Sequence, residues 1–382
     1  MRNCTITYFV AFTVMASLSF TFASLAFAAP KELATLEIGD AAPDFHLPGV
    51  DGKEYQLKDF AAAKLLLVVF TCNHCPTAQA YESRIAQLHA DYRDRGVALV
   101  AISPNDDQAV RLDELGYTDL GDSFADMKIR AKQRGFEFPY LYDGETQKVS
   151  LAYGVVATPQ VFLFDADRKL RYVGRIDDSE VKTPTSHDTR NALDALLAGK
   201  KVPVEKTRTF GCSTKWAEKR SDAKASLEKW EHEPVTLKTI DEDAVAKLAR
   251  NDGENLLLVN IWATYCGPCL AEMPELVTMN RMYRQRKFQM VTISLDEPSE
   301  EKEALKALQD RHVSSTNYLS GIENRDRFAD LIDKEWKGPL PHTLLIAPGG
   351  KVIYRKNGPL EPLELRGAIA DYLGRTYASK SK

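Results

Sequence analysis

The sequence has 382 residues, 44% of them hydrophobic and 27% charged, with a formal net charge of −4 at pH 7. A chain of this length is too long for one ordinary compact domain and suits two or three. The composition is that of a soluble globular protein, and the absence of a basic stripe argues against nucleic-acid binding.

The first 28 residues differ in composition from the rest of the chain. Arg2 is the only charged side chain before Lys31, and the apolar stretch between them ends in Ala-Phe-Ala at 26–28. This small-x-small pattern is typical of a signal-peptidase site, so we expect a signal peptide over residues 1–28 and a mature protein in the periplasm or another extracytoplasmic compartment. The alternative is an uncleaved segment, which is long enough to anchor the chain in a membrane.

The six cysteines are unevenly spaced. Cys4 lies in the predicted signal peptide, and the other five form two close pairs and one single residue: Cys72 with Cys75, Cys266 with Cys269, and Cys212. A disulfide framework would spread its cysteines through a small chain. A zinc site would need a second pair roughly 15–20 residues away, whereas 191 positions separate these two pairs. Tight Cys-x-x-Cys pairs indicate thiol–disulfide chemistry instead.

The chain contains a diverged internal repeat. Each copy has an apolar strand leading into a cysteine pair, a helical pattern, a second strand that ends in serine, and a hairpin opened by proline. The interval from the first cysteine to that serine is 31 residues in one copy and 28 in the other. This order predicts two α/β domains, each a mixed sheet flanked by helices. The strand and hairpin ranges are 64–70, 97–103 and 157–175, then 255–261, 288–294 and 340–358.

The segment around residues 202–234 fits neither copy and contains a charged run. We therefore expect a first domain over 36–204, a linker over 205–232 and a second domain over 233–376.

The second cysteine pair lies where a buried strand turns into a helix. A cysteine in the first helical turn faces unpaired backbone amides and the positive end of the helix dipole, and both lower its pKa. Cys266 is therefore the predicted nucleophile. Cys269, three residues later on the same helical face, can close the disulfide that releases a partner.

The motif VNIWATYCGPCLAEMPEL, followed by an LPHT hairpin, resembles the TlpA/ResA group of extracytoplasmic thioredoxin-like reductases over roughly residues 235–375. The resemblance implies a thioredoxin-like fold and disulfide reduction by the CGPC pair. It also implies that Glu272 modulates thiol ionisation and that Pro341 is a cis-proline exposing main-chain groups to the substrate backbone. The alternatives are a solvated first-turn glutamate and an ordinary turn proline.

The first domain opens with IGDAAPDFHLPGVDGKEYQL and continues with VVFTCNHCP and VVATPQVFLFD, which together resemble redoxin domains of the peroxiredoxin superfamily. Peroxiredoxins carry a P-x-x-x-T-x-x-C motif. If its cysteine is Cys75, the threonine position holds Cys72 and the proline position holds Val68. In peroxiredoxins the threonine and proline of this motif help to orient the peroxide against the thiolate, and both are missing here. Their absence favours dithiol exchange, with Cys72 as nucleophile, Cys75 as resolving thiol and Pro159 as cis-proline. A peroxidase recycled by the second domain is the alternative.

Two residues of the first domain keep more than one interpretation. His74 could stabilise the Cys72 thiolate, which would give the first site a higher reduction potential than the second, or it could be a solvent-facing loop residue. Cys212 could be an inert buried thiol, a third exchange cysteine or an intermolecular link.

These patterns predict an exported thiol–disulfide oxidoreductase with two Cys-x-x-Cys sites, rather than a scaffold that has lost turnover. Its expected partners are disulfide-bearing exported proteins and an electron donor, membrane-embedded or soluble. No metal or organic cofactor is implied, because the cysteines themselves carry the electrons.

Overall fold

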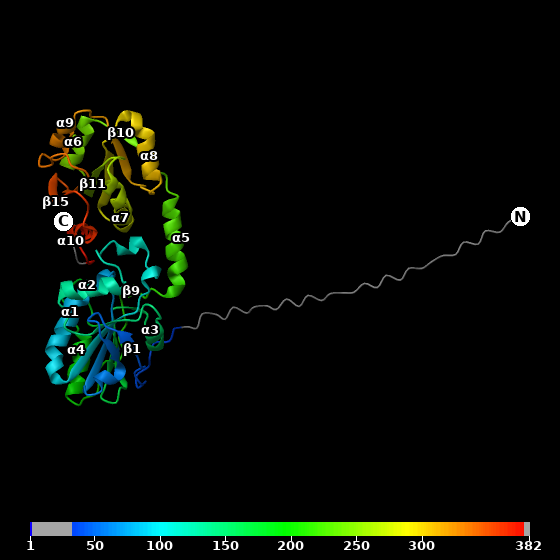
Figure 1. Ribbon diagram of the computed structural model, residues 1–382. Coiled ribbons are helices and arrows are strands. Elements are labelled where there is room, and N and C mark those ends of the chain that lie inside the picture. The colour runs from blue at the N-terminus through cyan, green and yellow to red at the C-terminus, as the bar shows by residue number, and fades with distance from the viewer. Residues whose placement is uncertain (2–32, 378–382) are drawn as a thin grey trace. The chain divides into compact units, whose positions relative to one another are not determined.

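A computed structural model of the chain describes Met1 and residues 33–377. The predicted signal peptide, apart from Met1, and Cys4 therefore lie outside the described residues. Of the helices in the described part of the chain, none is both long and apolar enough to cross a bilayer. Both copies of the repeat form the expected α/β domain (Figure 1).

The sheet of the first domain has the strand order β5-β4-β3-β7-β8. Its central strand β3 (Leu65–Phe70) is buried along its whole length, as expected of a continuous run of Leu, Val and Phe covered on both faces. It pairs in parallel with β4 (Val97–Ser103) and antiparallel with β7 (Gln160–Phe164). Alternate side chains of β3 enter two separate cores, so the carboxyl end of β3 is held firmly where the cysteines follow.

The sheet of the second domain has the order β10-β13-β12-β11-β14-β15. Here β11 (Leu256–Trp262) is the buried strand that leads to the cysteines. It is parallel to β12 (Phe288–Ser294) and antiparallel to β14 (His342–Ala347). Both domains thus place their cysteine pairs after the buried strand, close to the start of the following helix.

The other helices and strands complete the two domains. In the first they are β1 (His46–Pro48), β2 (Glu54–Gln56), α1 (Pro76–Tyr92), α2 (Phe124–Arg134), β5 (Tyr140–Tyr142), α3 (Lys148–Tyr153), β6 (Ala157–Thr158), β8 (Leu170–Gly174), α4 (Asp188–Leu197) and β9 (Cys212–Ser213). After α5 (Arg220–Glu231), the second has β10 (Lys238–Ile240), α6 (Glu242–Arg250), α7 (Gly267–Tyr283), α8 (Glu301–Gln309), β13 (Thr316–Ser320), α9 (Arg325–Ile332), β15 (Lys351–Asn357) and α10 (Pro362–Leu373).

The predicted linker at 205–232 is only partly a connector. Lys206 bridges to Val173 of β8, and β9 pairs with β6, so the first part of this segment belongs to the first domain. The helix α5 forms the rest of the segment.

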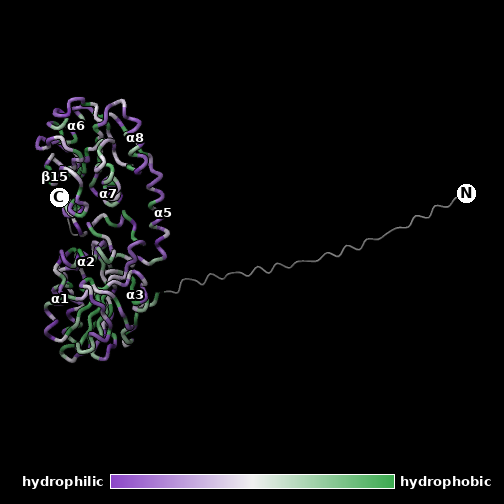
Figure 2. The backbone as a smooth tube through the Cα atoms, viewed as in Figure 1, coloured by the Kyte–Doolittle hydropathy of each residue, from purple (hydrophilic) through white to green (hydrophobic). Residues whose placement is uncertain are grey.

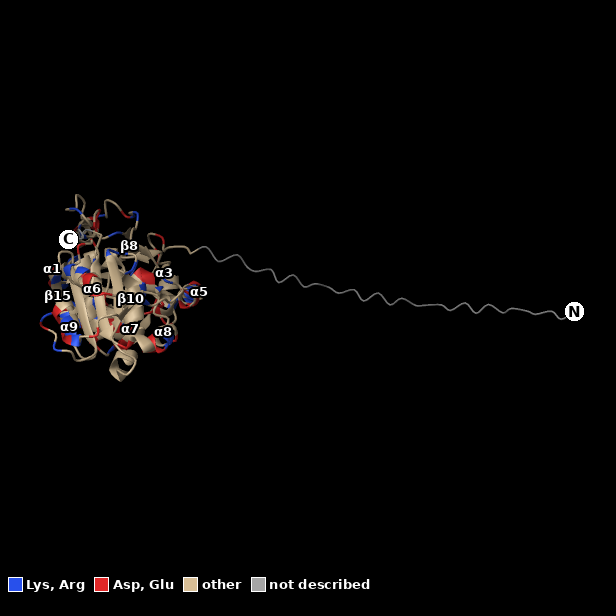
Figure 3. Ribbon diagram, turned by 90° about the horizontal axis from the view of Figure 1, so that it is seen from above, with Lys and Arg blue, Asp and Glu red and all other residues tan. Residues whose placement is uncertain are grey.

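The distribution of polarity agrees with two buried sheets. Hydrophobic residues concentrate along the central strands, while α5 and α8 are largely hydrophilic (Figure 2). On the helices seen in Figure 3, Lys and Arg are interspersed with Asp and Glu rather than gathered by sign.

Candidate active sites

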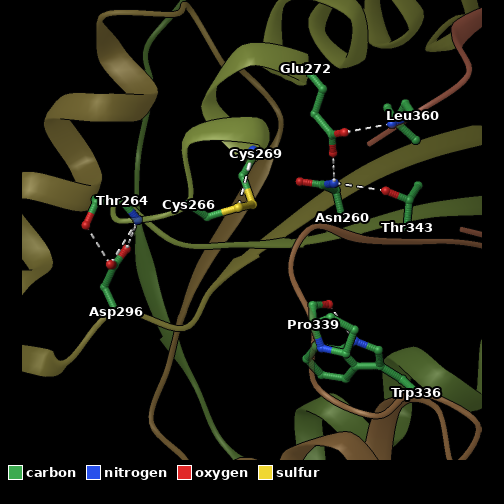
Figure 4. Close-up of a disulfide and its surroundings, with 10 residues drawn as sticks. All are labelled: Asn260, Thr264, Cys266, Cys269, Glu272, Asp296, Trp336, Pro339, Thr343 and Leu360. Carbon is green, nitrogen blue, oxygen red and sulfur yellow. Dashed lines mark hydrogen bonds between the residues drawn. A yellow bond between two sulfur atoms is a disulfide. The ribbon is translucent and has the colours of Figure 1, made fainter. Parts of the chain in front are cut away.

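The second cysteine pair sits at the amino terminus of α7. Cys266 is the residue that caps this helix, and its Sγ accepts a hydrogen bond from the backbone N–H of Cys269 at 3.3 Å. The two sulfurs form a disulfide (Figure 4). Cys266 is 8% exposed and Cys269 is fully buried, so an incoming thiolate can reach only the Cys266 sulfur. This geometry supports the prediction that Cys266 is the nucleophile and Cys269 the resolving thiol.

The peptide bonds preceding both predicted cis-prolines, Thr158-Pro159 and Leu340-Pro341, are cis. Each proline directly precedes the strand that pairs antiparallel with the strand leading to the cysteines. The cis prolines at 159 and 341 are therefore confirmed.

Glu272 is buried beneath the second site rather than solvated, so the interpretation as an exposed first-turn glutamate is wrong. Its Oε1 accepts a hydrogen bond from Nδ2 of Asn260 at 3.0 Å, and its Oε2 accepts one from the backbone N–H of Leu360 at 3.0 Å (Figure 4). Burial raises the pKa of Glu272 to about 7, although these two hydrogen bonds oppose the shift. A carboxyl with this pKa can take up and release a proton near neutral pH.

Asn260 was not among the predicted site residues. It is fully buried on β11, and its Nδ2 also donates to Oγ1 of Thr343 on β14 at 3.0 Å. The available signal was its place as the one amide within the apolar run 256–262, since a buried polar side chain needs hydrogen-bond partners.

The raised pKa of Glu272 makes stability depend on pH. Between about 4.5 and about 7 the folded state keeps a proton that the unfolded state releases, so stability falls as pH rises through this window and is level above it. We expect urea unfolding of Glu272→Gln, measured from pH 4 to 8, to show a shallower decline than wild type. Glu275→Gln, which replaces a half-buried carboxyl of the same helix that pairs with Arg366, is the matched control and should keep the decline assigned to Glu272. Equal slopes in wild type and Glu272→Gln would contradict the assignment.

Relative to the start of the following helix, the first cysteine pair lies three residues earlier in the chain than the second pair. Cys75, not Cys72, caps its helix, because α1 begins at Pro76. In each domain, one residue of the strand that leads to the cysteines pairs with the residue that follows the cis-proline. This residue is Phe70 in β3 and Ile261 in β11. Cys75 and Cys266 each follow that residue by five positions, and each precedes the serine of the next strand by 28. Cys75 is therefore the counterpart of Cys266, and Cys72 occupies the position of Ala263.

The electrostatics of the first site agree with this alignment. Burial raises the pKa of the Cys75 thiol, but hydrogen bonds from Cys212 and Cys72, the charge of His74 and a backbone N–H together hold it well below the usual range. Burial and the neighbouring Cys75 raise the pKa of Cys72 well above its usual value. These shifts favour Cys75 over Cys72 as the thiolate of this site, in contrast to the expectation that Cys72 is the nucleophile.

His74 is buried against Asp122, so the interpretation as a solvent-facing loop residue is wrong. Its Nδ1 lies 2.5 Å from Oδ2 of Asp122, and Oδ1 of Asp122 accepts the backbone N–H groups of Asn73 and His74 at 2.9 and 3.0 Å. Burial lowers the pKa of His74, but the adjacent Asp122 carboxylate outweighs it and the net shift is upward. The resulting positive charge favours the Cys75 thiolate, not that of Cys72 as predicted.

Cys212 joins the first site although it is distant in sequence. It pairs with Thr158 in the short ladder of β9 and β6, and its side chain packs against Cys72 and Cys75. Sequence reasoning left its position open, because nothing in the sequence around Cys212 indicates which strand it meets.

Cys72, His74 and Asp122 present sulfur, nitrogen and oxygen atoms within 4.8 Å of one another, a donor set that a soft divalent metal could accept. However, both Asp122 oxygens already accept hydrogen bonds from neighbouring groups, including Nδ2 of Asn105 at 2.7 Å. These hydrogen bonds account for the carboxylate without a metal.

Two family models match the chain, the AhpC/TSA family over residues 38–173 and Redoxin over residues 233–371. The thiol-disulfide oxidoreductase ResA of Oceanobacillus iheyensis is 28% identical over 138 residues, which are 35% of this chain and 67% of that protein. ResA of Bacillus thuringiensis subsp. konkukian is 30% identical over 139 residues, 35% of this chain and 68% of that one. A hypothetical protein of Sinorhizobium meliloti of known structure is 36% identical, with coverage of 48% and 97% and a TM-score of 0.44.

Proposed function

Because the chain belongs to the family of thiol-disulfide oxidoreductases that includes ResA, we propose that it exchanges disulfides in exported proteins through two distinct Cys-x-x-Cys sites. The observation that carries this proposal is the second site: a disulfide at the amino terminus of α7, in which Cys266 is 8% exposed and Cys269 is fully buried. The signal-peptide pattern at residues 1–28 supports export of the mature chain.

The second site would reduce a partner in two steps. The Cys266 thiolate attacks a disulfide of the partner, which forms a mixed disulfide and releases one partner thiolate. Cys269 then loses its proton and attacks Cys266, which releases the second partner thiolate and leaves the Cys266–Cys269 disulfide. Two electrons pass from the cysteine pair to the partner. Glu272, one helical turn after Cys269, is the group suited to accept the Cys269 proton.

The proposal is tested by reduction of insulin disulfides with dithiothreitol, using the full mature chain. Cys266→Ser is expected to lower turnover by about a hundredfold or more at the second site, because the attacking sulfur is lost. The assay is made in a Cys72→Ser, Cys75→Ser background, in which only the second site can act. Unchanged turnover after loss of Cys266 would overturn the proposal.

A peroxidase in the first domain is the second candidate, supported by the AhpC/TSA match over residues 38–173. Cys75 occupies the position of the helix-capping thiolate, but Cys72 stands where the motif has its threonine. Peroxide consumption that requires Cys75 and is fed through Cys266 would favour this candidate. Disulfide exchange without peroxide consumption would favour the first.

The two sites are expected to differ in reduction potential. The charge of His74 favours the reduced, thiolate form of the first site, so its disulfide should be the more oxidising. The measurement equilibrates the full chain with glutathione buffers, with the opposite cysteine pair replaced by serine. Equal potentials would contradict the role of His74.

A further inference from the structure

The segment that carries Cys212 is built to lie against the cis-proline turn of the first site. Its strand β9 runs antiparallel to Ala157 and Thr158, the two residues before Pro159. Gly211 has φ +139°, and a Cβ there would lie 2.0 Å from the carbonyl oxygen of Thr158. Only glycine permits this approach, so a glycine at 211 is required for the backbone to pack this closely against the turn.

This edge is where a thioredoxin-like site is expected to meet the backbone of its substrate. In the second domain, the residues directly before Pro341 have no strand partner among the residues that the structure describes. In the first domain, the chain's own β9 occupies the equivalent edge. Cys212 therefore lies where a substrate cysteine would lie, opposite the helix-capping Cys75.

The three sulfurs are ordered from the surface inwards. Cys212 is partly exposed, whereas Cys75 is fully buried and Cys72 is 2% exposed. Cys212 packs against the buried cluster that contains both Cys72 and Cys75, so the three thiols share one site. A partner in solution meets Cys212 before it meets either residue of the Cys-x-x-Cys pair.

We propose that Cys212 is the third redox residue of the first site, forming a disulfide with Cys75 and exchanging with partner thiols on behalf of the buried pair. This inference rests on the proposed dithiol function of that site.

Exchange between the first site and a partner dithiol through Cys212 takes three steps. Starting from a Cys72–Cys75 disulfide, the Cys212 thiol loses its proton and attacks the Cys75 sulfur, and Cys72 leaves as a thiolate and takes up a proton. A partner thiolate then attacks the Cys212 sulfur, and Cys75 leaves as a thiolate. The partner's second thiol, after losing its proton, resolves the mixed disulfide and frees Cys212. The partner dithiol loses two electrons, and the three cysteines end reduced.

The test maps disulfides in the full mature chain with Cys266 and Cys269 replaced by serine. Trypsin releases Cys212 on residues 209–215 and the Cys-x-x-Cys pair on residues 65–84, so a linkage between them has a unique mass. In Cys72→Ser, mild oxidation is expected to join these two peptides in most molecules. Cys212→Ser is expected to keep the Cys72–Cys75 disulfide but to exchange with a protein dithiol about tenfold more slowly.

The outcomes separate the inference from the proposed function. If oxidised Cys72→Ser keeps Cys75 and Cys212 as free thiols while the Cys72–Cys75 disulfide forms in Cys212→Ser, the inference is overturned and the dithiol site stands. If neither linkage forms in any variant, the proposed function of the first site fails as well. Cys212→Ala, compared by thermal unfolding, separates a loss of exchange from a loss of folding.

Discussion

Replacement of Cys75 by serine is expected to abolish the reactive thiolate of the first site and to lower its exchange rate by about a hundredfold or more. Cys75 is the residue that caps α1, and its pKa is held well below the usual range by its neighbours. Cys72→Ser should have the smaller effect, because it removes a thiol whose own pKa is raised.

The measurement is the ultraviolet absorbance of the thiolate as a function of pH, which does not depend on access to the buried sulfur, in the background in which Cys266 and Cys269 are serine. Wild type and Cys72→Ser should show a thiol that ionises well below pH 8, and Cys75→Ser should lack it. The reverse result, with the low-pKa thiol lost only in Cys72→Ser, would restore Cys72 as the nucleophile.

Asp122→Ala is expected to destabilise the first domain by about 3–5 kcal/mol, the range for removing one partner of a buried ion pair. The change leaves the buried His74 imidazole without its carboxylate. It also leaves the backbone N–H groups of Asn73 and His74 without an acceptor. Urea unfolding near pH 6 provides the measurement.

Two controls and a pH dependence sharpen this expectation. Asp122→Asn keeps an acceptor for the N–H groups and should cost less, and Asp107→Ala on the exposed 3₁₀ turn should cost no more than about 0.5 kcal/mol. The raised pKa of His74 makes the pair's contribution fall as pH rises through that pKa. The lowered pKa of Asp122 makes the contribution fall as pH drops through the Asp122 pKa. A loss of stability that is the same at every pH would contradict the ion pair.

The sequence predicted the fold and the backbone of both sites, because these follow from local patterns. Apolar strands, cysteines at a helix start and the two prolines are each recognisable within a few residues. The match of Cys72 with Cys266 was wrong because both pairs have the same Cys-x-x-Cys spacing and were compared from their first cysteines. The spacing of 28 residues to the following serine, counted from Cys75, was the signal that could have corrected it.

Asp122 and Cys212 could not be found in the same way. Asp122 meets His74 from 48 residues away, and Cys212 meets Thr158 across the β6–β9 ladder. Their positions depend on tertiary packing, which single-sequence patterns do not reveal. The sequence alone did not identify Gly211 as a site of close backbone packing, since a glycine can precede a cysteine for many other reasons.

The strand β9 gives the two sites different kinetic access to their surroundings. Small thiols can reach Cys266 directly, so the second site should equilibrate quickly with the redox buffer of its compartment. Under the proposed role of Cys212, the buried pair of the first site exchanges through Cys212 with partner proteins and only slowly with the same buffer. The two sites of one chain would then come to equilibrium with their surroundings at different rates.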